Sequence, residues 1–269
     1  TSPESNDAAS DTTCGDAARL DRRTPLNPSF TLDQFVKGPC SQLAHSAAVA
    51  VAERPGEVYN PFFVYGAGGL GKTHLLQGVV HAAAGRFGDG QCLYVSSRAF
   101  VDDAIRSLEN GRERELREYY GTVGLLAVDD AHLLAGRERS QEEFFHILNL
   151  LLTSQRQIVL AADRPPSEIA GLQERLASRL SAGLVVALDA PCLETRMAIV
   201  RDKATLLAIH LTKEIVRLVA ERYDADVRQL ADALVRMDAL SEFESSPITV
   251  ELAKRAIEPA RAAVATKTG

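Results

Sequence analysis

The chain has 269 residues, of which 46% are hydrophobic and 25% charged, an ordinary composition for a globular protein with a sizeable core. Its formal net charge of −6 argues against a dedicated duplex-DNA-binding module, which would be basic, but leaves room for a local basic groove. No apolar run is long enough to span a membrane and the four cysteines form no C-x-x-C pair, so we expect a cytoplasmic protein with free thiols.

The distribution of apolar residues divides the chain into four parts. Residues 1–24 are rich in small and polar side chains and are expected to form a tail without a core. From 25 to 190, short apolar runs alternate with helical patterns, which predicts an α/β domain with a parallel sheet covered by helices on both faces. Residues 191–262 predict a small all-helical domain, and 263–269 a second tail.

The apolar periodicity also predicts the individual elements in chain order. The expected strands are 62–65, 91–95, 123–128, 157–162 and 184–188. The expected helices are 72–84, 98–108, 112–120, 140–153, 171–180, 194–209, 213–221, 226–240 and 250–260, with Thr212, Asp226 and Thr249 as N-caps of the last three.

A glycine-rich loop follows the first expected strand and has the pattern G-x-x-x-x-G-K-T. Strand, loop and helix in this order are the context in which such a loop cradles nucleotide phosphates with its backbone N–H groups. Lys72 would place its charge at the β- and γ-phosphates, and the Thr73 hydroxyl would bind Mg²⁺. A glycine-rich turn without a ligand is the alternative. The predicted nucleotide-binding residues are Gly66, Ala67, Gly68, Gly69, Leu70, Gly71, Lys72, Thr73 and His74.

Two carboxylates end the apolar strand that begins near Val123. Such a strand is typical of the centre of a parallel sheet, whose carboxyl edge faces the ligand. Asp129 is therefore predicted to bind Mg²⁺, and Asp130 to polarise the water that attacks the γ-phosphate. Without the phosphate loop, two solvated aspartates in a turn would be the favoured explanation of the pair.

Polar residues at three further places have a functional and an ordinary interpretation. Asp163 ends another apolar strand, where P-loop ATPases with an inserted strand carry a residue that senses the γ-phosphate, yet a turn-forming aspartate explains it equally well. Arg175 and Arg179 share one helical face and could reach a neighbouring subunit's nucleotide. Arg228 stands at the start of a helix in the second domain. Each arginine could also be a solvated surface residue.

Stretches along most of the chain resemble the AAA+ ATPase domain of the bacterial replication initiator DnaA family. They include LNPSFTLDQFVKGP, NPFFVYGAGGLGKTHLL, LLAVDDAHLLAGRERSQEEFFHILN, QIVLAADRPPSEI, ERLASRL and DVRQLADAL, and the resemblance runs from about residue 26 to about 260. It departs from the family at Gly69, His132 and Leu180. The resemblance implies an AAA+ P-loop NTPase fold, a parallel sheet sandwiched by helices and followed by a helical lid.

The resemblance also implies roles for individual residues. Arg179 would be the arginine finger, Arg175 a second interface arginine, Asp163 sensor 1 and Arg228 sensor 2. Phe35, Val36 and Asn60 would line the adenine pocket. The helices within 98–120 resemble the family's inserted pair, and Ile105, Arg137 and Arg139 fall where the family contacts single-stranded DNA.

The implied function is a slow, switch-like ATPase that binds ATP or ADP with Mg²⁺. With ATP it would assemble head-to-tail into a filament that holds single-stranded origin DNA. A replicative helicase or a clamp-linked regulator would be reached through domains outside this sequence. The chain would be either the trimmed ATPase domain of an initiator or a regulatory paralogue without the duplex-binding domain. The nucleotide motifs alone would also fit a helicase-loader-type AAA+ protein or a metabolic P-loop kinase.

Overall fold

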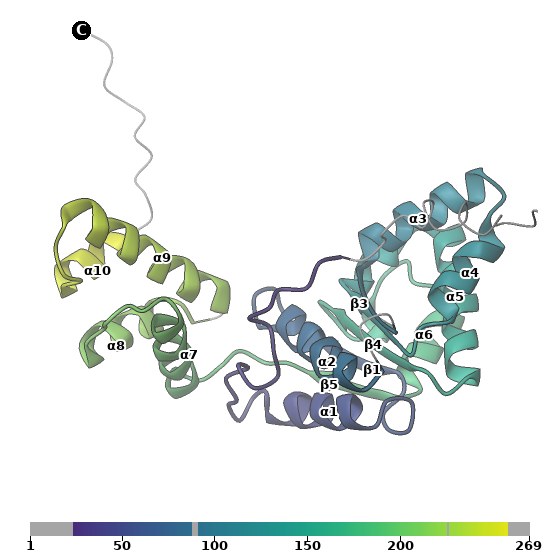
Figure 1. Ribbon diagram of the computed structural model, residues 1–269, viewed down its shortest axis with the longest axis horizontal. Coiled ribbons are helices and arrows are strands. Elements are labelled where there is room, and N and C mark those ends of the chain that lie inside the picture. Colours follow the sequence, from purple (N-terminus) through teal and green to yellow (C-terminus); the bar gives the residue numbers. More distant parts are fainter. Residues whose placement is uncertain (1–23, 88–90, 225, 258–269) are drawn as a thin grey trace, which may run out of the picture.

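The computed structural model describes residues 24–87, 91–224 and 226–257 of the chain. Figure 1 shows an α/β core and a group of four helices, α7 to α10, that follows it and lies to one side. The expected tails, apart from Thr24, and residues 258–262 of the expected helical domain lie outside the described residues. Within the described part, no helix is both long and apolar enough to cross a membrane.

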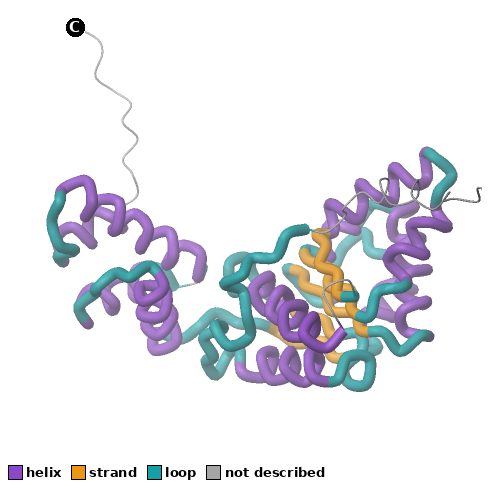
Figure 2. The backbone as a smooth tube through the Cα atoms, in the orientation of Figure 1, coloured by secondary structure: helices purple, strands orange, loops and turns teal. Residues whose placement is uncertain are grey.

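A five-stranded parallel sheet forms the centre of the core, in the order β2-β3-β4-β1-β5 (Figure 2). All five carboxyl ends therefore meet at one edge of the sheet. The central strands are completely buried because helices cover both faces. The strands are β1 Phe62–Tyr65, β2 Cys92–Ser96, β3 Leu125–Asp129, β4 Gln157–Ala162 and β5 Leu184–Ala187.

Alternating side chains of these strands feed two hydrophobic cores. Phe62 and Val64 face the core shared with α1 and α2, whereas Phe63 faces the core shared with α3 to α6. One sheet thus holds two layers of helices. These helices are α1 Gln42–Glu53, α2 Lys72–Phe87, α3 Ser97–Glu109, α4 Glu113–Gly121, α5 Glu138–Thr153 and α6 Glu174–Ser181, with 3₁₀ turns η1 Ala131–Leu134 and η2 Pro166–Glu168.

The helical lid has its own hydrophobic core, in which Leu230, Leu234 and Met237 of the longest lid helix are fully buried. Its helices are α7 Leu193–Leu206, α8 Lys213–Arg222, α9 Val227–Glu244 and α10 Val250–Ile257. The three predicted N-caps are confirmed: Thr212, Asp226 and Thr249 each accept a hydrogen bond from a backbone N–H of the helix that follows.

The predicted strands and most of the predicted helices are confirmed, with three corrections. Helix α1 was not predicted, because its alanine-rich sequence carries no strong periodic signal. Helix α6 begins at Glu174 and not at 171, because Gly171 has a φ of 83°. Helix α7 ends at Leu206 and not at 209, because Ala208 has a φ of 56°.

Candidate functional site

The glycine-rich loop connects β1 to the first turn of α2, and three of its glycines adopt backbone conformations that other residues rarely tolerate. Gly66 has a φ of 156°, Gly69 a φ of 79° and Gly71 a φ of 98°. A side chain on Gly71 would also press on the Phe35 ring, 3.2 Å away. The loop therefore curls tightly against the start of α2, where unpaired N–H groups and the helix dipole favour an anion.

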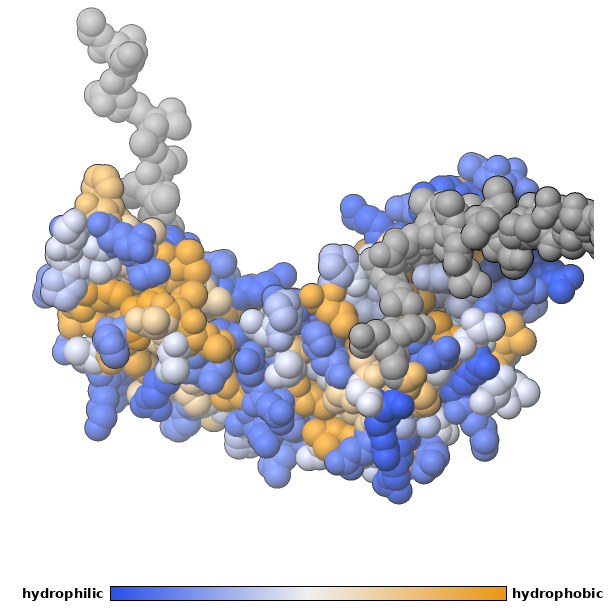
Figure 3. All heavy atoms as spheres, viewed as in Figure 1, coloured by the Kyte–Doolittle hydropathy of each residue, from blue (hydrophilic) through white to orange (hydrophobic). Residues whose placement is uncertain are grey.

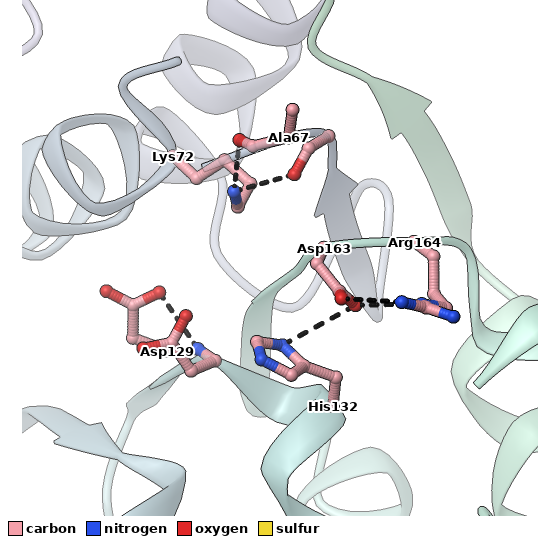
Figure 4. A network of polar contacts seen from close by, with 8 residues as sticks. Ala67, Lys72, Asp129, His132, Asp163 and Arg164 are labelled. Atoms are coloured by element: carbon pink, nitrogen blue, oxygen red, sulfur yellow. Dashed lines mark hydrogen bonds and ion pairs between the residues drawn. The ribbon is translucent and has the colours of Figure 1, made fainter. Parts of the chain in front are cut away.

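Lys72 lies inside the curl of this loop (Figure 4). Its Nζ donates hydrogen bonds to the carbonyl oxygens of Gly66, at 2.7 Å, and Ala67, at 2.8 Å. Burial lowers the pKa of the ammonium, and the nearby carboxylates of Asp129, Asp130 and Asp163 oppose that shift. A buried cation held by the phosphate loop gives the site the charge that polyphosphate requires.

The side chains of Thr73, Tyr94 and Asp129 meet at the end of β3, and Asp129 is only 4% exposed. Its Oδ2 accepts hydrogen bonds from the hydroxyls of Thr73, at 2.6 Å, and Tyr94, at 2.9 Å. Its Oδ1 accepts one from the backbone N–H of Asp130, at 2.9 Å. A hydroxyl and a carboxylate side by side, at the mouth of a phosphate loop, fit Mg²⁺, which takes few protein oxygens and completes its shell with phosphate and water.

Tyr94 is a site residue that the sequence did not reveal. Burial, followed by the charge of Asp129, raises the pKa of its phenol, so the hydroxyl keeps its proton and remains a donor. Tyr94 belongs to β2, and it reaches Asp129 because β2 pairs directly with β3. The sequence pattern gives no information about that pairing, since β2 and β3 are separated by two helices.

Asp130 follows Asp129 at the point where β3 leaves the sheet. Its φ of 53° turns the chain sharply into η1. Although the residue is exposed overall, burial of its carboxyl and the charge of Asp129 raise the pKa of Asp130. The Asp130 carboxylate thus stands beside the Thr73–Asp129 pair without itself bonding to Thr73 or Tyr94.

Asp163 lies beside this group because β4 stands between β1 and β3. Arg164 holds its carboxylate with hydrogen bonds of 3.2 and 3.0 Å and thereby lowers the pKa of Asp163. On its other side lies His132, with Nδ1 3.7 Å from Asp163 Oδ1 (Figure 4). The structure thus brings together Lys72, Thr73, Asp129, Asp130 and Asp163, as the sequence predicted.

The lid reaches the phosphate loop through the start of α9. The backbone N–H of Val227 donates to the carbonyl of Gly69, at 3.0 Å, and a side chain on Gly69 would meet the Asp226 carboxylate. The guanidinium of Arg228 lies above Gly68, 3.0 Å from where a Cβ would stand. Arg228 therefore comes from the lid to the same loop that holds Lys72.

A pocket opens between the phosphate loop, the segment before α1 and the lid. Phe35 and Val36 line it, as the sequence predicted, together with Gly71, His74 and Ile199. The His74 ring stacks on Phe30, with centroids 4.8 Å apart. Burial lowers the pKa of His74, so it is a neutral, flat wall at ordinary pH.

Asn60 does not belong to this pocket, and its predicted role is wrong. It precedes β1 and therefore lies at the opposite edge of the sheet from the phosphate loop. Its amide donates to the carbonyl of Arg156 and accepts from the N–H of Ile158, at 2.8 and 3.0 Å. Asn60 thus fixes the beginning of β4.

The remaining predicted residues lie away from Lys72 on the surface. Arg179 is exposed in the last turn of α6, and Arg175, one turn earlier, lies over the Phe145 ring and 3.4 Å from Glu142. Ile105 is 37% exposed on α3. Arg137 and Arg139 are exposed at the start of α5. No described contact joins any of these five residues to the phosphate loop of the same chain.

The comparisons with known proteins agree with this geometry. The model of the bacterial DnaA ATPase domain matches residues 26–187. The chromosomal replication initiator DnaA of Latilactobacillus sakei is 44% identical over 237 residues, 88% of this chain and 53% of that protein. The chain spans about half the length of the curated relatives it matches.

Solved structures give the same result. Domain III of DnaA from Thermotoga maritima is 38% identical with a TM-score of 0.83, covering 88% of this chain and all of that one. A DnaA structure bound to AMPPCP and single-stranded DNA is 34% identical with a TM-score of 0.75, covering 82% of this chain and 70% of that one. The chain therefore belongs to the bacterial DnaA ATPase domain family.

Proposed function

We propose that this chain binds ATP with Mg²⁺, hydrolyses it slowly, and uses the bound nucleotide to control assembly on single-stranded DNA. The observation that carries the proposal is the joint site at the sheet edge, where the core supplies Lys72, Thr73 and Asp129 and the lid supplies Arg228. A nucleotide bound there touches both parts, so its γ-phosphate can influence how they sit together. We also propose residues 25–190 and 191–262 as the two domains.

Each side chain has a role that its position supports. Lys72 binds the β- and γ-phosphates, Thr73 and Asp129 hold Mg²⁺, and Phe35, Val36 and His74 bound the base. When bound, Mg²⁺ neutralises charge that develops on the phosphate oxygens. Asp130 orients the attacking water. Its carboxylate is shorter than a glutamate and lies outside the Thr73–Asp129 contact, which favours slow turnover.

Assembly is proposed from the residues that this site leaves at the surface. Arg179 is exposed on α6 and would reach the γ-phosphate bound by the next subunit, with Arg175 beside it. Such a contact is head-to-tail and builds an open filament when the rotation does not close. Figure 3 shows hydrophobic surface gathered over the lid, which suits a face that meets a neighbour. Among the lid residues, Val235 is 55% and Leu206 50% exposed.

Single-stranded DNA is proposed as the ligand of the assembled form. One solved relative is bound to AMPPCP and single-stranded DNA. Arg137 and Arg139 at the start of α5, with Ile105 on α3, would repeat along a filament and form a basic track despite the net charge of −6. A chain with this function would act in the cytoplasm, and contacts with a helicase or a clamp-linked regulator would need further domains.

The test separates nucleotide binding from assembly. Arg179→Ala should bind ATP as the wild type does but neither sediment as an oligomer nor retain a fluorescent oligonucleotide, whereas Lys72→Ala should fail at the first step. Sedimentation and anisotropy are measured with a non-hydrolysable ATP analogue and with ADP. Equal strand binding in both nucleotide states would refute the coupling and favour a helicase-loader-type protein that acts through a protein partner.

A further inference from the structure

His132 stands at the nucleotide site without a role in the proposed reaction. It lies in η1, two residues after Asp130, and its side chain is 27% exposed. Its Nδ1 is buried and has no hydrogen-bond partner among the described residues. Asp163 Oδ1 lies 3.7 Å from this nitrogen, a distance slightly too long for a hydrogen bond. A buried ring nitrogen without a partner, beside a carboxylate at an ATP site, calls for an explanation.

The backbone around His132 fixes where its ring can lie. The left-handed turn at Asp130 and the short η1 helix direct the ring toward the end of β4, where Asp163 begins the next loop. Figure 4 shows the ring between the end of β3, with Asp129, and the carboxylate of Asp163. The imidazole thus lies at the ends of the two central strands, β3 and β4.

Asp163 has two competing partners. Arg164, its neighbour in sequence, holds the carboxylate from the solvent side, and the Arg164 side chain is 52% exposed. His132 offers a second donor on the side of Asp163 that faces Asp129 (Figure 4). Contacts that serve catalysis are often long without substrate and shorten when it binds, so the 3.7 Å separation is a short movement away from a hydrogen bond.

We propose that His132 is a positioning residue for ATP hydrolysis, which donates from Nδ1 to the Asp163 carboxylate and draws it away from Arg164 toward the γ-phosphate. This inference rests on the proposed function, because it assigns His132 to the same reaction. Asp163 placed in this way helps to hold the attacking water and Asp130 in line with the γ-phosphate. His132 itself touches neither nucleotide nor water.

Replacing His132 with asparagine or glutamine distinguishes a hydrogen bond from Nδ1 to Asp163 from simple packing of the ring. The amide nitrogen of asparagine overlies Nδ1 of histidine, whereas that of glutamine corresponds to Nε2. His132→Asn should therefore keep most of the hydrolysis rate, and His132→Ala should lose it. An oriented hydrogen bond to a charged group corresponds to a fall in kcat of about 10-fold to 100-fold. Affinity for a non-hydrolysable ATP analogue should remain within about threefold.

The experiment measures kcat, KM and analogue affinity for the wild type and for His132→Ala, →Asn and →Gln, with Leu133→Ala as the control for disturbing η1. Nitrogen NMR of the imidazole should show the His132 Nδ1 resonance moving when Asp163→Asn is introduced, and this readout does not depend on turnover. If His132→Ala does not fold, the hydrolysis rates of His132→Asn and Arg164→Ala still test the proposal. Arg164→Ala should hydrolyse ATP at least as fast as the wild type, because it removes the competing partner of Asp163.

The results distinguish a failure of the role proposed for His132 from a failure of the proposed ATPase function. Recovery by asparagine and not by glutamine, with unchanged analogue affinity, supports the proposal. Wild-type hydrolysis by His132→Ala, equal losses in all three variants, or a loss in Arg164→Ala overturns it while leaving the ATPase assignment intact. If the wild type does not exceed the Lys72→Ala background, the proposed function itself fails, and the role of His132 with it.

Discussion

The contact between the lid and the phosphate loop depends on a glycine, and Gly69→Ala should break it. The new Cβ would stand 1.8 Å from Asp226 Oδ1, so the carboxylate must move. Moving it removes the N-cap bond to the Arg228 N–H, now 2.9 Å long, and disturbs the bond from Val227 to the Gly69 carbonyl. Alanine at a φ of 79° adds its own strain.

The expected loss follows from these contributions. The left-handed backbone costs about 1–2 kcal/mol for alanine. Loss of an N-cap costs about 1 kcal/mol, and a weakened backbone hydrogen bond up to about 1 kcal/mol more. Gly69→Ala should therefore lower the free energy of unfolding by about 2–4 kcal/mol, measured by urea denaturation followed by circular dichroism.

Asp226→Ala supplies the matched control. Alone it should cost about 1 kcal/mol, since it removes the cap together with a 3.4 Å contact to the exposed Arg228 guanidinium that adds little. In the double variant the alanine at 69 no longer meets a carboxylate, so the combined loss should fall short of the sum by about 1 kcal/mol. Strict additivity of the two single losses, or a Gly69→Ala protein as stable as the wild type, would refute the proposed contact.

Two further predictions concern the carboxylates of the site. The pKa of Asp130 is raised in the folded protein, so its protonated form stabilises the fold below an ordinary aspartate pKa of 3.8, and that stability is lost as the pH rises through the raised value. Asp130→Asn should therefore have a slightly higher melting temperature than the wild type at pH 7, by no more than about 2 °C because the residue is exposed. The difference in melting temperature should shrink toward pH 4, and the variant should hydrolyse ATP more slowly. A lower melting temperature than the wild type at pH 7 would contradict this prediction. Tyr94→Phe removes the hydroxyl that donates to Asp129 over 2.9 Å and should cost about 1–2 kcal/mol in urea denaturation. It should also weaken ATP binding in Mg²⁺ but not in EDTA, with Tyr65→Phe as the control, and equal weakening in both buffers would remove Tyr94 from the metal site.

The sequence predicted those parts of the site that are local in the chain. The glycine loop, Lys72 and Thr73 lie within one strand–loop–helix unit, so their spacing is sufficient to place them. Asp129 was found because a carboxylate that ends an apolar strand lies at the ligand edge of a parallel sheet. The same rule excludes Asn60 from the ligand edge, because Asn60 precedes its strand.

Residues that contact one another across strands could not be found in this way. Tyr94 reaches Asp129 only because β2 neighbours β3, and His132 reaches Asp163 only because β4 neighbours β3. Many strand orders are compatible with the same alternation of strands and helices. The periodic pattern therefore predicts the layers of the fold but not which loops meet at its edge.

The position of β4 between β1 and β3 connects the proposed hydrolysis of ATP with the arrangement of the core and the lid. The strand that precedes Asp163, β4, lies between β1, which leads into the phosphate loop, and β3, which ends at Asp129. The lid is bound to the other side of that loop through Gly69 and Val227. In the proposed function, a γ-phosphate bound at this loop would contact Asp163 from the core and Arg228 from the lid, and its removal would release both contacts at once. A slow ATPase built in this way holds one arrangement of core and lid for as long as ATP persists, which is the property required of a switch and not of a motor.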